Sequence, residues 1–318
     1  MRITPAETRL PAIAFQLRTG QTVTLPAQHI LATQEFLVAP GIAWRAQQGS
    51  ISQACPLARA EVYSIFADAI ATVETAVVSS AGTVQMLRRT VLDKLVLEET
   101  PLPGASPEMC ATTLCAHLQK EGLEALKRLP WDSTTRQWQA RVCFMRKLEG
   151  DAWPDVSDSA LLENVETWLA PFLTAPDALK QLSERQFAQA LASLLPWQLG
   201  KKLETEAPSV WQSPAGIRHP IVYGDDGGPW LAAKLQEFFG CKETPRIAGG
   251  RVPLTLHLNS PAGRPLQITQ DLAHFWGSGY AAVRAEMLGR YPRHPWPENP
   301  MEAVPTAKTK KQAQRYAL

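Results

Sequence analysis

The spacing of apolar residues changes twice along the 318-residue chain, near residues 103 and 207. Residues 1–103 alternate apolar and polar side chains in short runs, which predicts strands. Residues 104–207 repeat apolar residues every three or four positions, which predicts helices. Both patterns occur in residues 208–318. We therefore expect an α+β chain of three domains with these boundaries.

Residues 1–103 should form a small β-barrel of the oligonucleotide/oligosaccharide-binding (OB) kind. The segment AFQLRTGQTVTL is typical of a hairpin that turns at Thr19-Gly20. One helix opens at Pro56 and carries Val62, Phe66 and Ile70 at intervals of four. Short strands with one helix among them are typical of an OB-like barrel.

The central block should be a helical bundle. Ser106 and Pro107 suit an N-cap and a first helical residue, and Ser183 with Gln186 suits a capping box. Apolar stripes of this kind form cores far more often than cofactor sites. The stripes are Cys110, Leu114 and Leu118; Trp138, Val142 and Met145; Leu161, Val165, Trp168, Leu169 and Phe172; and Phe187, Leu191, Leu194 and Leu195.

The third block should mix helices and strands. Leu231, Leu235, Phe238 and Phe239 have helical spacing, and Gly240 would end that helix. The segment RVPLTLHLNSPAGRPLQIT indicates a strand, a turn and a strand. Two helices should follow, a short one capped by Thr269, and a last one that carries Tyr280, Val283 and Met287 and ends at Gly289.

The segment GRYPRHPWPENP, residues 289–300, follows that last helix. Proline fixes φ and removes a backbone donor, so the segment can be neither a helix nor a central strand. We expect an extended arm in a polyproline-like conformation. Tyr291 and Trp296 should anchor the arm in apolar pockets, and Arg290, Arg293 and His294 should face outward.

No residue pattern predicts catalysis. Gly200-Lys201-Lys202 is the only Gly-Lys step, and Lys202 stands where a phosphate-binding loop needs Ser or Thr. A triad of Ser260, His257 and Asp271 lacks the nucleophile elbow, and the pair Asp271 and His274 is too small to specify a metal site. We expect no catalytic residue, cofactor or metal in this chain.

The cysteines and the apolar runs indicate the cellular compartment. Five cysteines, without the spacing of a zinc site, indicate reduced thiols. The sequence shows no signal peptide and no apolar run of ~20 residues. We expect a cytoplasmic monomer without a membrane partner.

The net charge of +2 is too small for a general nucleic-acid binder, so any such contact must be local. Basic residues beside aromatics in the third block suit phosphate contact and base stacking. A solvated surface with a frayed tail would account for the same residues. The candidates for nucleic-acid contact are Arg246, Arg251, Arg264, Arg284, Arg290, Arg293, Lys308, Lys310 and Lys311.

Residues 244–300, TPRIAGGRVPLTLHLNSPAGRPLQITQDLAHFWGSGYAAVRAEMLGRYPRHPWPENP, resemble the closing signature of the HrpB family of bacterial DEAH/DExH-box ATP-dependent helicases. The segments LLPWQLGKKLE, ENVETWLAPFL, LVLEETPLP, FQLRTGQTVTL and EFLVAP extend the resemblance over nearly the whole chain. The resemblance implies an OB-like domain in the first block and a family-specific extension in the other two.

The resemblance covers only the C-terminal part of the family. The family's two RecA-like motor domains, winged-helix domain and helical accessory domain would precede it. No position matches the Walker A lysine, the DEAH box or the arginine finger, so ATP and Mg²⁺ are expected only in the motor domains. The chain would then be a C-terminal fragment, a split-gene product or a truncated reading frame of an NTP hydrolase.

Two functions are compatible with this resemblance. The first is an accessory region that binds or guides single-stranded RNA or another nucleic acid beside motor domains supplied in cis or in trans. The second is a scaffolding module that docks on the motor or a partner and does not touch nucleic acid.

Overall fold

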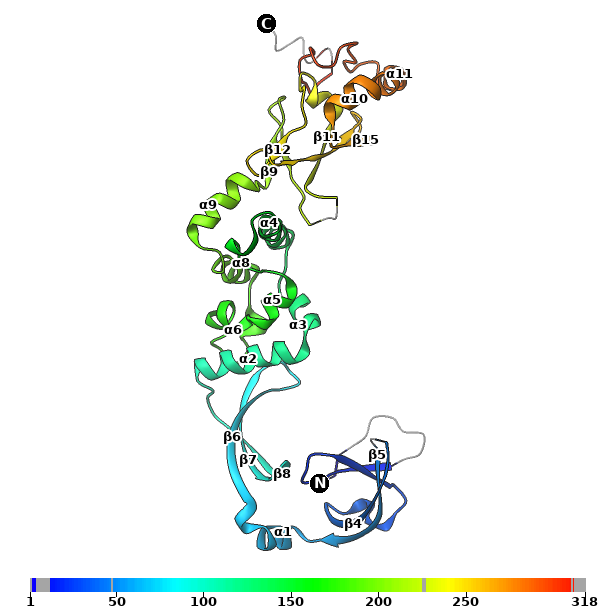
Figure 1. The fold of residues 1–318 in the computed structure, drawn as a ribbon. Coiled ribbons are helices and arrows are strands. Elements are labelled where there is room, and N and C mark those ends of the chain that lie inside the picture. The colour runs from blue at the N-terminus through cyan, green and yellow to red at the C-terminus, as the bar shows by residue number, and fades with distance from the viewer. Residues whose placement is uncertain (1, 4–11, 47, 225–226, 310, 312–318) are drawn as a thin grey trace. The chain divides into compact units, whose positions relative to one another are not determined.

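The computed structural model describes residues 2–3, 12–46, 48–224, 227–309 and 311. They form an α+β fold in which small sheets at both ends of the sequence flank a run of helices (Figure 1). Two compact units divide the chain, Met1–His117 with Ala170–Gln181, and Leu118–Leu169 with Leu182–Leu318. These units do not coincide with the three domains that the sequence suggests, and the boundaries at 103 and 207 stay a prediction.

The strands of the described residues are β1 (Arg2–Ile3), β2 (Ala12–Gln16), β3 (Thr22–Pro26), β4 (Phe36–Arg45), β5 (Gln48–Leu57), β6 (Ile70–Val78), β7 (Val84–Leu92), β8 (Leu95–Leu102), β9 (Val210–Gln212), β10 (Arg218–Pro220), β11 (Trp230–Lys234), β12 (Arg246–Ile247), β13 (Val252–Pro253), β14 (Thr255–Asn259) and β15 (Pro265–Thr269). The α-helices are α1 (Arg59–Ile65), α2 (Pro107–Glu121), α3 (Leu123–Lys127), α4 (Ser133–Glu149), α5 (Asp158–Glu163), α6 (Val165–Trp168), α7 (Ala178–Gln181), α8 (Glu184–Ala192), α9 (Trp197–Glu206), α10 (Leu272–Ser278) and α11 (Tyr280–Arg290). The 3₁₀ helices are η1 (Ile30–Thr33), η2 (Ala67–Ala69), η3 (Gly150–Ala152), η4 (Ala170–Phe172) and η5 (Leu235–Phe238).

The N-terminal unit contains two sheets. The predicted hairpin is confirmed, because β2 and β3 pair antiparallel and place buried Phe15 opposite buried Val23. The first sheet runs β1-β2-β3-β5-β4, and β6, β7 and β8 form a second sheet. The described strands do not form the closed OB-like barrel that the sequence predicted. The reason is that β1 and β4 remain sheet edges and β6 to β8 pair only among themselves.

The helix expected from Pro56 to Ile70 is shorter in the structure. Helix α1 ends at Ile65, and Ile70 begins strand β6, opposite Leu92 of β7. Strand pairing therefore decides the conformation of Ile70 against its helical spacing. Val62, which is 2% exposed, keeps its expected place in the core with Leu92.

The helical run follows its local signals closely. Helix α2 begins at Pro107, and the Met109 amide donates to Ser106 Oγ at 3.2 Å. The capping box of Ser183 and Gln186 precedes α8 as expected. The third apolar stripe is split, since Asn164 separates α5 from α6. Within the part of the chain that is described, no helix is long and apolar enough to cross a bilayer.

The C-terminal sheet has the order β11-β14-β15, with β11 and β14 parallel. The helix expected over 231–239 is instead strand β11 followed by η5. The spacing of Leu231 and Leu235 misled the prediction, because a buried strand residue followed by a buried residue of a 3₁₀ helix can give the same four-residue spacing as one helix. Leu231, Leu235 and Phe238 are nonetheless fully buried.

The two last helices differ from the prediction, α10 at its start and α11 at its end. The N-cap of α10 is Asp271, whose carboxylate accepts the His274 amide at 2.8 Å, and not Thr269. This use of Asp271 leaves its carboxylate engaged with the backbone rather than with a metal. Helix α11 ends at Arg290, one residue beyond Gly289, and the proline-rich segment begins there.

Candidate nucleic-acid interface

The arm formed by residues 291–300 is docked on helix α11. Trp296 is 4% exposed, and its indole Nε1 donates to the Tyr291 carbonyl at 3.1 Å. Arg284 Nε donates to the Trp296 carbonyl at 3.0 Å, and the Tyr280 hydroxyl donates to the Pro297 carbonyl at 2.9 Å. The arm's carbonyls thus find donors on α11, which a proline-rich segment needs because it cannot pair its backbone regularly.

The other side of the arm contacts η5 and the residues that follow it. Gln236 is fully buried and its Nε2 donates to the Pro295 carbonyl at 2.8 Å. The Gly240 amide donates to the Pro300 carbonyl at 2.9 Å. The arm is therefore a fixed part of the C-terminal block and not a loose tail.

His294 does not face outward as the sequence suggested. It is partly buried, and burial first and the Lys234 charge second lower the pKa of His294 from its usual value of 6.5. The imidazole is consequently neutral in most molecules at pH 7. Tyr291 is also only partly buried, with its ring edge-on to His294 at 6.3 Å between centroids.

The arginines of α11 and the arm differ in how far they are engaged. Arg284 Nε donates to the Trp296 carbonyl and its Nη2 lies 3.3 Å from Glu298, so its guanidinium is engaged within the chain. Arg290 pairs with Glu286 at 3.0 Å, but both side chains are about 60% exposed, and such pairs contribute little. Arg293 is exposed and forms no ion pair with any described residue. Arg290 and Arg293 are therefore accessible to an anion.

The arginines of the β12–β13 hairpin are bonded within the chain. Arg246 Nε donates to the Gly250 carbonyl at 2.6 Å. Arg251 donates to Glu149 at 2.8 Å and to Glu206 at 3.4 Å. The hairpin lies beside α9, whereas α11 lies at the far end of this block (Figure 1). The structure does not bring Arg246 and Arg251 together with the arm.

The remaining basic candidates lie at separate places. Arg264 is exposed in the turn between β14 and β15, where its guanidinium has no ion-pair partner in the described chain. Lys308 and Lys311 are exposed near the C-terminal end. Lys310 lies outside the described residues. Nucleic-acid contact by any of these side chains stays a prediction.

Sequence reasoning missed an aromatic pair in the same block. The rings of Trp230 on β11 and His257 on β14 stack at 4.4 Å between centroids and 11° between planes. Both side chains are partly exposed. Strand alternation around these two residues could have placed them on one sheet face, but the mistaken helix over 231–239 concealed it.

Sequence reasoning also missed a cluster around Glu149 at the end of α4. Lys202 Nζ, Trp153 Nε1 and Arg251 Nη2 all donate to the Glu149 carboxylate, at 2.7, 2.8 and 2.8 Å. These bonds, with the one from Lys202 as the largest contribution, lower the pKa of Glu149 to about 2. The cluster joins α4, α9 and the β12–β13 hairpin.

The groups that could suggest an enzyme have other partners. Ser260 Oγ accepts the Arg264 amide at 3.1 Å and His257 stacks on Trp230, so the imagined triad is not assembled. Buried Ser213 and Glu237 lie beside partly buried His219, with His219 Nε2 2.6 Å and Ser213 Oγ 3.0 Å from the same Glu237 oxygen. In that trio the serine contacts the carboxylate and not the histidine, which is unsuited to activating a nucleophile. No group of three or more potential metal ligands occurs among the described residues.

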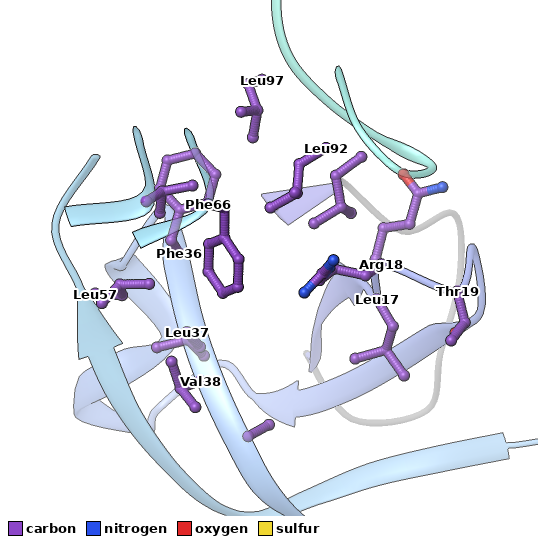
Figure 2. Close-up of a pocket in the computed structure, with 14 residues that line it drawn as sticks. Leu17, Arg18, Thr19, Phe36, Leu37, Val38, Leu57, Phe66, Leu92 and Leu97 are labelled. Carbon is purple, nitrogen blue, oxygen red and sulfur yellow. The ribbon is translucent and has the colours of Figure 1, made fainter. Parts of the chain in front are cut away.

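The N-terminal unit carries an apolar pocket of about 340 Å³ between its two sheets (Figure 2). Phe36, Phe66 and Leu97 are among its lining residues. The Arg18 guanidinium lies 4.7 Å from the centre of the Phe66 ring, and its Nε donates to Asp93 at 2.7 Å. The pocket therefore offers an apolar surface with one cation, already paired, among its lining residues.

Residues 168–300 match the family model of the ATP-dependent helicase C-terminal region, HrpB_C. The chain is 36% identical over 307 residues to the ATP-dependent RNA helicase HrpB of Escherichia coli (strain K12), covering 93% of this chain and 37% of the relative. It thus spans well under half the length of that curated relative.

Two solved structures are similar. The E. coli DExH-box NTPase HrpB matches with a TM-score of 0.63 and 35% identity, over 93% of this chain and 37% of that one. The Escherichia coli DEAH/RHA helicase HrpB matches with a TM-score of 0.55 and 31% identity, over 91% of this chain and 36% of that one.

Proposed function

We propose that the chain, which is similar to the C-terminal region of the HrpB family of ATP-dependent helicases, binds or guides single-stranded nucleic acid beside a motor. The E. coli relative is named an ATP-dependent RNA helicase, so RNA is the nucleic acid proposed. RecA-like motor domains, in cis or in trans, would bind ATP and Mg²⁺. The chain alone would have no catalytic role.

The observation that carries this proposal is the docked arm with its accessible arginines. Arg293 is exposed and unpaired within the described chain, and Arg290 has only a solvent-exposed partner. The arm's bonds to Arg284 and Gln236 hold the backbone near Arg293 before any ligand arrives. A preorganised cation loses less conformational entropy on binding a phosphate than a cation on a mobile tail.

The N-terminal unit, whose described strands form two open sheets, would contribute a base-stacking residue. Two observations support this contribution of the N-terminal unit. They are the family resemblance and Trp44, which is 44% exposed near the end of β4. An added Cβ at Gly49 would lie 2.9 Å from the Trp44 ring, so glycine at this position gives the indole its space. An exposed indole offers a stacking face to an unpaired base.

Filter binding of labelled single-stranded RNA across a salt series tests the proposal. Each phosphate contact with a single strand contributes about −0.7 to the slope of log K against log salt, so two arginines alone give a slope of about −1.4. Single-stranded RNA should compete better than a duplex of the same length. Retention no greater than that of an unrelated protein of similar charge would overturn the proposal.

Docking on a partner is the second candidate function, and the pocket in Figure 2 is the observation that favours it. Val38 lines the pocket and is 44% exposed, so Val38→Glu should place a charge there at little cost to folding. Ile30→Glu, at a residue 83% exposed outside the pocket lining, is the matched control. Gel filtration with separately purified motor domains should show co-migration that only Val38→Glu abolishes. Equal behaviour of the two variants would exclude the pocket as a docking site.

A further inference from the structure

The β11-β14-β15 sheet has one buried face and one open face. Leu231, Leu256 and Leu258 are fully buried on the first face. The alternate residues of β11 and β14 are all partly exposed. On β15, Ile268 pairs with His257 and is 56% exposed. The second face is therefore accessible over all three strands.

Two aromatic rings are held together on this open face. Trp230 pairs in register with Thr255, which places His257 diagonally beside it on the neighbouring strand. The resulting stack, with 11° between the planes, is fixed by two paired strands and not by a loop. Rigid, partly exposed rings on a sheet are the arrangement on which unpaired bases stack in several nucleic-acid-binding modules.

The charge of the sheet is uniformly favourable for a phosphate backbone. The three strands, WLAAK, TLHLN and PLQIT, contain no acidic residue. Lys234 lies at the end of β11 opposite Asn259, and Arg264 is exposed in the turn that follows β14. Lys234 lies four residue steps beyond Trp230 along the strand, a distance of about 13 Å. Rings and cations thus occupy opposite ends of one short surface.

We propose that the open face of the β11-β14-β15 sheet is a base-stacking platform for single-stranded nucleic acid, with a base on the Trp230–His257 pair and phosphates directed toward Lys234 and Arg264. The inference rests on the proposed function and deepens it by locating the base contact. The lack of acids and the cations at one end favour a polyanion over a peptide as the occupant. Because the face carries stacking and charge but no array of base-edge donors and acceptors, binding should be tolerant of sequence.

Fluorescence anisotropy with a labelled oligouridine of about 12 nucleotides tests the platform on the full chain. Ile268→Glu places an acid on the open face at an exposed position and should weaken affinity at least about fivefold. Ile65→Glu, at a residue 63% exposed on α1, should change affinity less than about twofold. Equal affinities of these two variants would overturn the platform.

A second pair of variants separates stacking from charge. Trp230→Leu should weaken binding about tenfold, whereas Trp230→Phe, which keeps a stacking face, should remain within about threefold of the wild type. Trp197→Leu is the matched control, because Trp197 is 69% exposed on α9. An oligomer with abasic sugars should bind wild type and Trp230→Leu equally. If it instead retains the tenfold difference, stacking is not the contact.

Crosslinking with 4-thiouridine keeps the test independent of variant stability. The platform predicts crosslinks in the peptides that contain Trp230 or His257. Binding with crosslinks confined to the arm would overturn the platform and leave the proposed function standing. No binding by the wild type would overturn both. Equal affinity for the corresponding DNA oligomer would support a stacking site that does not read the 2′-hydroxyl.

Discussion

The Glu149 carboxylate accepts a hydrogen bond from the Arg251 guanidinium at 2.8 Å, although 102 residues separate them in the sequence. The carboxylate's other oxygen accepts from Lys202 and Trp153. The side chain of Glu149 is only 15% exposed, so these bonds are partly shielded from water. Glu149 therefore ties the end of α4 to α9 and to the β12–β13 hairpin.

Glu149→Gln should lower the free energy of unfolding by about 1 to 2 kcal/mol at pH 7, because charge-assisted bonds are lost at a partly shielded site. The folded-state pKa of Glu149 is lowered from 4.5 to about 2, so this stabilisation exists above about pH 5 and disappears as the pH falls to about 2. Urea unfolding of wild type and Glu149→Gln at several pH values measures this difference in the free energy of unfolding. Glu302→Gln, on an exposed residue, is the control. A difference between Glu149→Gln and wild type that is constant from pH 7 to pH 2 would contradict the assignment.

Trp296→Ala should destabilise the C-terminal block by about 3 kcal/mol, because it removes a nearly fully buried indole and leaves a cavity. Trp197→Ala should cost less than about 1 kcal/mol, because Trp197 is 69% exposed and its ring carries the exposed Lys201 ammonium 3.9 Å from its centre. Urea unfolding followed by circular dichroism compares the two. Equal losses would mean that the arm does not depend on its tryptophan.

Tyr280→Phe should cost about 1 kcal/mol, because the hydroxyl's bond to the Pro297 carbonyl is lost. Burial raises the pKa of Tyr280 to about 12, so this contribution is complete below pH 10 and declines as the pH rises toward 12. The hydroxyl of Tyr63 makes no hydrogen bond to another described residue, which makes Tyr63→Phe the control. Unfolding at pH 7 should separate the two variants. An unchanged stability for Tyr280→Phe would show that the bond from the Tyr280 hydroxyl to the Pro297 carbonyl does not stabilise the fold.

The features that the sequence predicted correctly depend on neighbours in the chain. The Ser183–Gln186 capping box and the hairpin of β2 and β3 are decided within about fifteen residues. The spacing of Val62, Phe66 and Ile70 predicts a helix through Ile70. However, Ile70 pairs with Leu92 of β7, and spacing along the chain does not show which residues pair across strands. Closure of the expected OB-like barrel also depends on which distant strands pair. Sequence spacing does not show this pairing.

In the candidate site, too, features set by neighbours in the chain could be predicted, and features set by distant residues could not. The burial of Trp296 follows from the two prolines beside it, which are visible in the sequence. The lowered pKa of His294 depends on burial and, second, on the charge of Lys234, which lies 60 residues earlier on β11. Arg251 resembled a free cation because Glu149 and Glu206 come from two helices far away in the chain. Charge composition alone cannot distinguish a paired arginine from an accessible one.

The isolated chain should hydrolyse no ATP, because no segment offers a phosphate-binding loop with its lysine and its magnesium ligand. A coupled assay on protein freed of contaminating helicases by gel filtration measures this activity. Activity that co-elutes with the chain and exceeds the buffer rate would contradict the prediction. Lys201→Ala and Lys202→Ala, at the only Gly-Lys step, would then be the first variants to examine.

The salt dependence of single-stranded RNA binding by an arm variant tests the central claim most directly. Arg290→Ala combined with Arg293→Ala should weaken binding and make the slope of log K against log salt shallower by about 1.4. Lys120→Ala combined with Arg185→Ala removes the same charge from exposed residues of α2 and α8 and should leave the slope unchanged. If the arm variant keeps the wild-type slope, the arm does not contact the phosphates and the proposed role of its arginines is wrong.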